Sequence, residues 1–125
     1  QPILDRDCVR CHNGSSGPEK SELALTAEPE GNSALAWSKS YINLKPYLGL
    51  HMPTLSRPGQ IGADHSKLAA ILTGKAHGKY VKLPDKDLRT LYLWLDANAP
   101  FYGTYEEKEL LAQKLSQAVP PPLLQ

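Results

Sequence analysis

The chain has 125 residues and a formal net charge of +1, and 41% of its residues are hydrophobic, with a single Phe and a single Met. A charge so close to neutral gives no electrostatic reason to expect a nucleic-acid partner, and no apolar run is long enough to span a membrane. The length fits one domain. A core built from these side chains alone would be thin, so a bound apolar group would give them more surface to pack on.

The strongest signal is a Cys-x-x-Cys-His run near the start, formed by Cys8, Cys11 and His12, and the chain has no other cysteine. This spacing is the attachment signature of a c-type haem. The two thiols form thioethers with the porphyrin vinyl groups, and the adjacent imidazole is then held close enough to ligate the iron. We therefore predict one covalent haem c, with both cysteines consumed and His12 as the proximal iron ligand.

Two rival interpretations use the same residues. A thioredoxin-like dithiol needs a βαβ pattern around the motif, which this sequence lacks. A zinc site with two Cys and two His ligands needs histidines at finger-like spacing. His51, His65 and His77 are poorly spaced from Cys11 for such a site. Zinc is the main rival to haem.

Apolar periodicity, caps and breakers predict an all-α chain of four to five helices packed around the haem, with no strand. In chain order, the expected helices cover residues 2–11, 33–46, 64–74, 84–98 and 106–118. Pro2 suits the first turn of the first helix, while Ser33 and Asp64 are good N-caps for the second and third. The Gly- and Pro-rich segments 13–31 and 47–62 are expected to be irregular.

The fourth of these helices has the clearest pattern. Pro84, Asp85 and Asp87 mark its N-terminus, because proline and acidic residues favour the first helical turn. Apolar side chains then recur at helical spacing and predict one buried face. That face consists of Leu88, Leu91, Tyr92 and Leu95.

The chain is expected to divide into three segments. Residues 1–105 would form a small monohaem cytochrome-c-like domain, and residues 106–118 would form a C-terminal amphipathic helix. Residues 119–125 contain three consecutive prolines, which cannot continue a helix. We expect them to be a linker or tail.

Three blocks of sequence resemble the cytochrome-c-like domains of large exported planctomycete proteins. The first is residues 1–12 and the second is 62–68; the third includes His77 and 81–83 and continues through 91–105. The haem domains of the hydrazine synthase alpha subunit of anammox bacteria are similar to the same group. The resemblance implies an all-α c-type haem domain within a larger exported protein. It implies no single function, because such domains are joined to many different partners.

The sixth iron ligand decides whether the iron is closed or open to small molecules. We predict His77, which precedes Pro84 by seven residues and lies between Gly74 and Gly78. Glycine on either side lets the backbone approach the haem closely. The resembling domains also carry a histidine at this place, which implies distal imidazole ligation by His77.

Other sixth ligands stay open. Met52 precedes a proline, as the ligand methionine of ordinary cytochromes c does, but about thirty residues separate it from the helix at Pro84. His51 and His65 are further candidates. The iron could also be open, or ligated by Tyr80.

Several other side chains have two interpretations each. Trp37 and Trp94 are expected to be core aromatics, although an indole N–H can also bind a haem propionate. Arg6, Arg10 and Arg57 could pair with propionates or be solvated surface charges. Four lysines form a basic strip beside the predicted sixth ligand, and this strip is either a solvated rim or a docking surface for an acidic redox partner. They are Lys75, Lys79, Lys82 and Lys86.

These residues predict electron transfer by a six-coordinate, bis-His haem. No Ser-His-Asp set, carboxylate pair or phosphate-binding glycine loop stands out, so we expect no catalytic residue, although such a domain can be the electron-transfer module of an oxidoreductase. The alternative is a catalytic or gas- or peroxide-sensing haem with an open or displaceable sixth ligand. The expected partner is a redox protein or a fused catalytic domain. Because haem c is attached outside the cytoplasm, we expect a periplasmic or otherwise exported protein, of which this chain is a processed piece.

Overall fold

The computed structural model describes residues 1–17, 21–32, 36–50, 57–102 and 106–115. In these residues the chain is mostly helical and contains no sheet, only two isolated bridges between extended segments. The helices are α1 (Pro2–Asp7), α2 (Lys39–Leu44), η1 (Lys45–Tyr47), α3 (Gly62–His65), α4 (Lys67–Thr73), η2 (His77–Lys79), α5 (Asp85–Asp96) and α6 (Glu107–Lys114), where η marks a 3₁₀ turn. The prediction of a helical chain without a sheet is therefore confirmed for the described residues.

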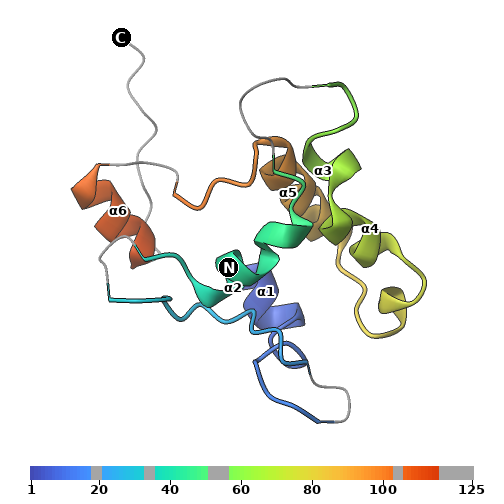
Figure 1. Cartoon of the computed structure of the whole chain (residues 1–125), viewed down its shortest axis with the longest axis horizontal. Coiled ribbons are helices and arrows are strands. Elements are labelled where there is room, and N and C mark those ends of the chain that lie inside the picture. Colours follow the sequence, from blue (N-terminus) through green and yellow to red (C-terminus); the bar gives the residue numbers. More distant parts are fainter. Residues whose placement is uncertain (18–20, 33–35, 51–56, 103–105, 116–125) are drawn as a thin grey trace.

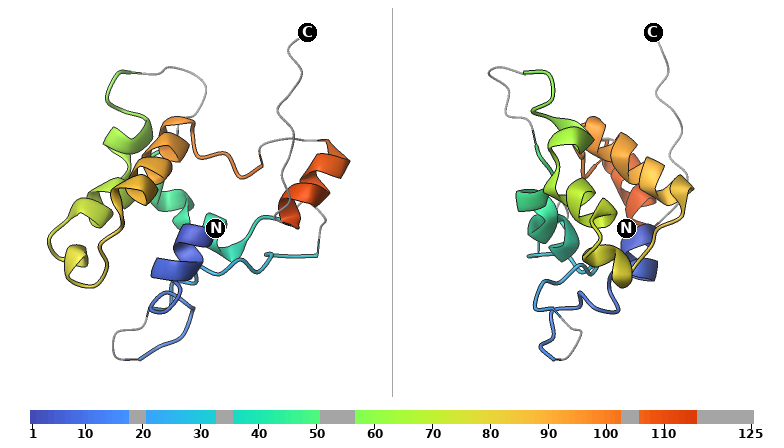
Figure 2. Two further views of the ribbon diagram at one scale, coloured as in Figure 1. Left: turned by 180° about the vertical axis from the view of Figure 1, so that it is seen from behind. Right: turned by 90° about the vertical axis from the view of Figure 1, so that its right-hand side faces the viewer.

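The helices fall into two unequal groups (Figures 1 and 2). The α3, α4 and α5 helices lie together on one side of the molecule, with α1 and α2 beside them near its centre. The α6 helix stands apart at the other side. No helix in the described ranges is both long enough and apolar enough to cross a bilayer.

The first helix is shorter than the sequence predicted, because it ends at Asp7 rather than at Cys11. The amides of Cys8 and Val9 both donate to the carbonyl of Leu4, at 2.9 and 3.0 Å. Two hydrogen bonds to one carbonyl are typical of the C-terminal end of a helix. The two cysteines therefore lie in the turn that follows α1 and not within the helix.

The second helix begins later than predicted. The expected cap, Ser33, lies outside the described residues, and the observed cap is Ser38, whose Oγ accepts from the amide of Tyr41 at 3.2 Å. The hydroxyl of Ser38 also lies 2.7 Å from that of Ser40, which in turn donates to the side chain of Gln1. The observed cap, Ser38, is thus connected to the N-terminal residue Gln1 through Ser40.

The helix expected to begin at Asp64 is two helices, α3 and α4. Asp64 lies inside α3, and the break falls at Ser66, whose backbone is extended (φ −77°, ψ 122°). The Ser66 hydroxyl accepts from the amide of Ala69 at 3.3 Å and donates to the carbonyl of Tyr47 at 2.9 Å. Because Ser66 is the N-cap of α4 and has an extended backbone, it ends α3 and separates the two helices.

The α5 helix follows its prediction closely. It begins after Pro84 and ends at Asp96, where the sequence predicted an end near Asn98. Leu91 and Leu95 are buried, and Leu88 and Tyr92 are half-buried. The apolar face predicted from the spacing is therefore the face that packs on the core.

The core brings together side chains from distant parts of the chain, between Leu4 and Ala99. Its buried members are Leu25, Leu44, Leu48, Leu68, Ala69, Leu95 and Ala99, and half-buried Leu4, Cys8 and Val9 pack against them. Full burial of one leucine contributes about 1.5–3 kcal/mol to stability. Because Cys8 packs on this core, the core fixes the position of the turn that carries the cysteines.

The C-terminal part of the chain is described only as far as residue 115. In α6, Leu110 is buried, whereas Leu111 and Leu115, the latter just beyond the helix, are exposed. The predicted linker, residues 119–125, lies outside the described residues. The three-part division of the chain stays a prediction.

Two of the predicted sequence blocks meet where α3 packs on α5. Gly62 begins α3 with a φ of +70°, which L-residues rarely adopt. A Cβ at this position would lie 2.5 Å from Oδ1 and 3.2 Å from Cα of Asp96. The same Oδ1 accepts the amide of Ala63 at 2.8 Å. Only glycine therefore lets α3 begin against the end of α5.

We expect Gly62→Ala to lower the free energy of unfolding of the protein by about 2 kcal/mol or more, because it adds a steric clash to a strained φ. Gly31→Ala is the matched control, since Gly31 also has a positive φ, +99°, but a Cβ there would meet nothing within 4 Å. The control should cost about 1 kcal/mol or less. Denaturant unfolding measures both values, and equal losses would contradict the packing argument.

Candidate haem-binding site

The turn after α1 holds the two cysteines close together. The amides of Cys11 and His12 both donate to the carbonyl of Cys8, at 3.1 and 2.9 Å. Both cysteines are half-buried and neither forms a disulfide. The motif is thus one hydrogen-bonded turn in which two thiols and an imidazole are neighbours.

The environment of Cys8 disfavours its thiolate. Burial raises the pKa of the Cys8 thiol, and the charges of Asp7 and Cys11 raise it further. Reactive dithiols have the opposite property, a pKa lowered by positive charge or a helix N-terminus. The structure therefore gives no support to a thioredoxin-like dithiol. Within the described ranges, no group of three or more His, Cys, Asp or Glu side chains lies in a position to hold a metal ion.

The backbone of His12 is hydrogen-bonded to a core residue. Its carbonyl accepts the amide of Leu25 at 2.8 Å, and Leu25 is 5% exposed. The predicted loop thus folds back onto the motif and places Leu25 in the core. Burial lowers the pKa of His12, and the nearby His77 lowers it further. A lower pKa favours the neutral imidazole, which is the form that binds a metal.

His77 begins the η2 turn between α4 and α5. The amide of Gly78 donates to the carbonyl of Gly74 at 2.9 Å, and the carbonyl of His77 accepts the amides of Tyr80 and Val81 at 2.9 and 3.3 Å. The chain around His77 is therefore a tight, hydrogen-bonded turn. Its side chain is half-buried, whereas the residues next to it are exposed.

The structure brings the rings of His12 and His77 together. Their centroids lie 6.3 Å apart and their planes are inclined by only 21°. A bond from a metal to an imidazole nitrogen is about 2 Å long, so two imidazoles on opposite sides of one metal have ring centres about 6.4 Å apart. The observed separation matches the separation that a shared metal requires.

Both rings also contain a buried nitrogen that the protein does not satisfy. The Nδ1 atoms of His12 and His77 are buried, and neither has a hydrogen-bond partner among the described residues. Such atoms are uncommon in native proteins and call for an explanation. Two of them in one facing pair of rings indicate a pair built for a partner that the polypeptide itself does not supply.

The other proposed sixth ligands are not placed in this way. His65 is exposed at the end of α3, and Tyr80 is 60% exposed. His51 and Met52 lie outside the described residues. Of the described candidates, His77 alone has its ring facing that of His12.

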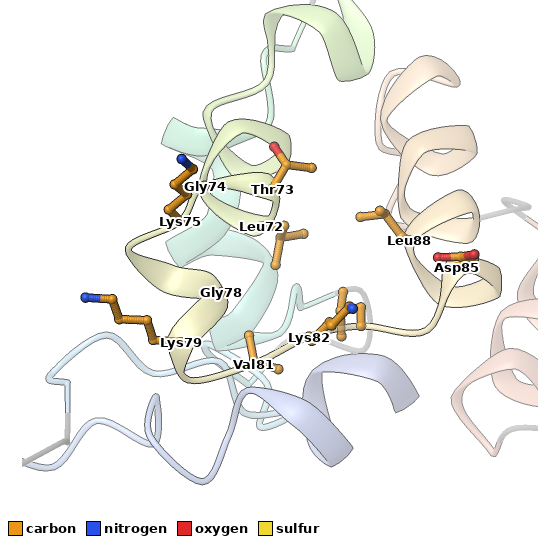
Figure 3. A pocket seen from close by; sticks show the side chains of 11 residues that line it. Leu72, Thr73, Gly74, Lys75, Gly78, Lys79, Val81, Lys82, Asp85 and Leu88 are labelled. Atoms are coloured by element: carbon orange, nitrogen blue, oxygen red, sulfur yellow. The ribbon is translucent and has the colours of Figure 1, made fainter.

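Two hollows flank the segment that carries His77. One, of about 440 Å³, lies between α4 and the start of α5; Leu72, Val81 and Leu88 point into it, while Lys75 and Lys79 extend away (Figure 3). The other, of about 710 Å³, is lined mainly by apolar atoms on the side of α4 and includes His77 itself. Neither is lined by the cysteines. The thiols and the two imidazoles, rather than either hollow, therefore define the candidate haem site.

Two arginines connect the cysteine-bearing region to α5 and to the His77 segment. Arg6 pairs with Asp7 and Asp87 at 2.6 and 2.5 Å, and these carboxylates raise the pKa of its guanidinium. Nη2 of Arg10 donates to the carbonyl of Tyr80 at 2.7 Å. Neither arginine is a purely solvated charge. Asp87 and Tyr80 could not be predicted as partners from the sequence, because they lie 81 and 70 positions away from Arg6 and Arg10.

The two tryptophans differ from each other. Trp94 packs against the core, as predicted, and its Nε1 donates to the carbonyl of Pro100 at 2.9 Å. Trp37 is 40% exposed, so its prediction as a core residue is wrong. Its ring contacts Tyr41 edge-on, and Nζ of Lys45 lies 4.6 Å from its centroid. Trp37 therefore covers the surface of α2.

Comparisons of the chain with protein-family models, with curated proteins and with solved structures found no match. The interpretation of the site consequently depends on its own residues and geometry. The resemblance to planctomycete cytochrome-c-like domains stays a prediction from the sequence.

We expect the exported protein to have the mass of the polypeptide plus one haem, because both thiols are neighbours in one turn. Intact-protein mass spectrometry measures this, and acid–acetone extraction should leave the haem attached. The double variant Cys8→Ala/Cys11→Ala is the control and should lose the covalent haem. Correctly exported protein at the polypeptide mass would contradict the prediction, and bound zinc would select the rival metal.

Proposed function

We propose that this chain is a c-type cytochrome domain that transfers electrons. Cys8 and Cys11 would hold one haem covalently, and His12 and His77 would ligate its iron from the two sides. The observation that carries the proposal is the facing pair of imidazoles, 6.3 Å apart and inclined by 21°, beside the Cys-x-x-Cys-His turn.

Each residue has a separate task in this proposal. The thiols tether the group, and the core that packs on Cys8 fixes the tether. His12 and His77 supply neutral nitrogen donors on both sides. When bound, haem c supplies a one-electron ferric–ferrous couple, whose potential depends on the axial ligands. Two imidazoles are stronger donors to ferric iron than an imidazole and a thioether, so we expect a lower potential than in a His/Met cytochrome.

Electron transfer is favoured over chemistry on a substrate because both axial positions would be filled. A small molecule could then reach the iron only after an axial bond breaks. The partner would be a redox protein or a catalytic domain fused to this one. The four lysines of the basic strip, Lys75, Lys79, Lys82 and Lys86, are all exposed and are available to a partner of opposite charge. Because haem c is attached outside the cytoplasm, the proposal implies a periplasmic or otherwise exported location.

The axial ligands are tested by substitution at His77. The unmodified protein should have a low-spin spectrum, and its ferrous form should bind carbon monoxide slowly or not at all. His77→Ala should give a high-spin ferric haem and rapid, stoichiometric carbon monoxide binding, because it removes one axial ligand. Absorption spectra of the oxidised and reduced protein, with and without carbon monoxide, measure both effects.

Met52→Leu is the matched control and should leave the low-spin spectrum unchanged. A sulfur-to-iron charge-transfer band that disappears in Met52→Leu would show that Met52, and not His77, is the sixth ligand. Rapid and stoichiometric carbon monoxide binding by the unmodified protein would show an open iron. The catalytic or sensing alternative would then replace electron transfer.

A further inference from the structure

We infer that Arg10 is a positioning residue for His77 and limits how often the sixth ligand leaves the iron. The inference rests on the proposed function, because it assigns a role in keeping His77 bound. Arg10 stands between Cys8 and Cys11 in the sequence and belongs to the turn that carries His12. Its partner, Tyr80, follows His77 by three residues.

The contact joins the two turns directly. Nη2 of Arg10 donates to the carbonyl of Tyr80 at 2.7 Å, across seventy positions of the chain. A hydrogen bond from a charged donor is shorter and stronger than a neutral one. Because the same turn carries His12, this bond connects the proximal side of the candidate haem site to the distal side.

The hydrogen bond from Arg10 would restrain His77 through the short turn that joins His77 to Tyr80. The amide of Tyr80 donates to the carbonyl of His77 at 2.9 Å, and the next amide, from Val81, donates to the same carbonyl. A carbonyl bound by two amides fixes the position of His77 relative to Tyr80. When Arg10 holds Tyr80, it therefore also holds the backbone of His77.

The residues on either side of His77 are poorly buried. Ala76, Gly78, Lys79 and Tyr80 are all exposed, and a Cβ at Gly78 would meet nothing within 4 Å. Figure 3 shows the side chain of Lys79 extending from this turn away from the neighbouring hollow. A turn with so little packing gains much of its fixed position from its hydrogen bonds.

Arg6 provides a comparison within the same region. It also connects the N-terminal segment to a distant element, but its partner is Asp87 on α5, and it contacts Asp7 as well. Arg6 therefore holds α1 to α5 without holding the turn of His77. The two arginines separate a general loss of stability from a specific loosening of the sixth ligand.

The test measures the rate at which carbon monoxide binds to the ferrous holoprotein, together with the denaturant midpoint of unfolding. Arg10→Gln removes the charged donor and should raise the rate about tenfold, as expected for the loss of one charge-assisted hydrogen bond. Arg10→Lys keeps a charged donor and should bring the rate back to within about threefold of the unmodified protein. Arg6→Gln should change the rate less than about twofold, even where it lowers the unfolding midpoint.

The outcomes separate this inference from the proposed function. If His77→Ala opens the iron but Arg10→Gln binds carbon monoxide no faster than Arg6→Gln, the role of Arg10 is overturned and bis-His ligation stands. If His77→Ala leaves the low-spin spectrum unchanged, His77 is not a ligand, and both bis-His ligation and the role of Arg10 are overturned. A faster rate in Arg10→Gln that Arg10→Lys reverses supports the positioning role.

Discussion

The spacing of two imidazoles is the constraint on which the rest of this small structure depends. His12 and His77 come from distant turns, and in the proposed site one metal could bind both only while their ring centres stay close to the observed 6.3 Å apart. The spacing is too wide for direct stacking to maintain it. Other contacts must therefore hold each turn in place.

Each turn is held in a different way. The His12 turn is built into the core, since Cys8 packs on it and Leu25 donates to the carbonyl of His12. The His77 turn is mostly exposed and is held by hydrogen bonds, including the one from Arg10. The turn of His12 is thus packed on the core, while the turn of His77 is more exposed and is held by polar contacts. With the proposed bis-His ligation, His77 would be the more easily released of the two ligands.

The sequence predicted local features well and tertiary ones poorly. The α5 helix was predicted nearly to its ends because Pro84, two acids and the leucine spacing all act within the helix. The sequence predicted Ser33 as the cap of α2, whereas the structure has Ser38. Either serine can cap a helix, and the contacts that connect Ser38 through Ser40 to Gln1 are not visible in the local sequence. The break at Ser66 was missed for the same reason, since its hydroxyl binds a distant carbonyl. The neighbouring glycines and the family resemblance were enough to propose His77 as a candidate ligand. The hydrogen bond from Arg10 to the carbonyl of Tyr80 could not be predicted, because it joins residues seventy positions apart.

The most direct test of the account is electron paramagnetic resonance of the frozen, oxidised holoprotein, because this spectrum reports both the spin state and the angle between the axial imidazole planes. Two imidazoles inclined by about 21° should give a rhombic low-spin signal with three resolved g values. A dominant high-spin signal would contradict the account by showing that His77 does not bind the iron. A low-spin signal with one very large g value would show imidazole planes that are close to perpendicular, which this structure does not allow.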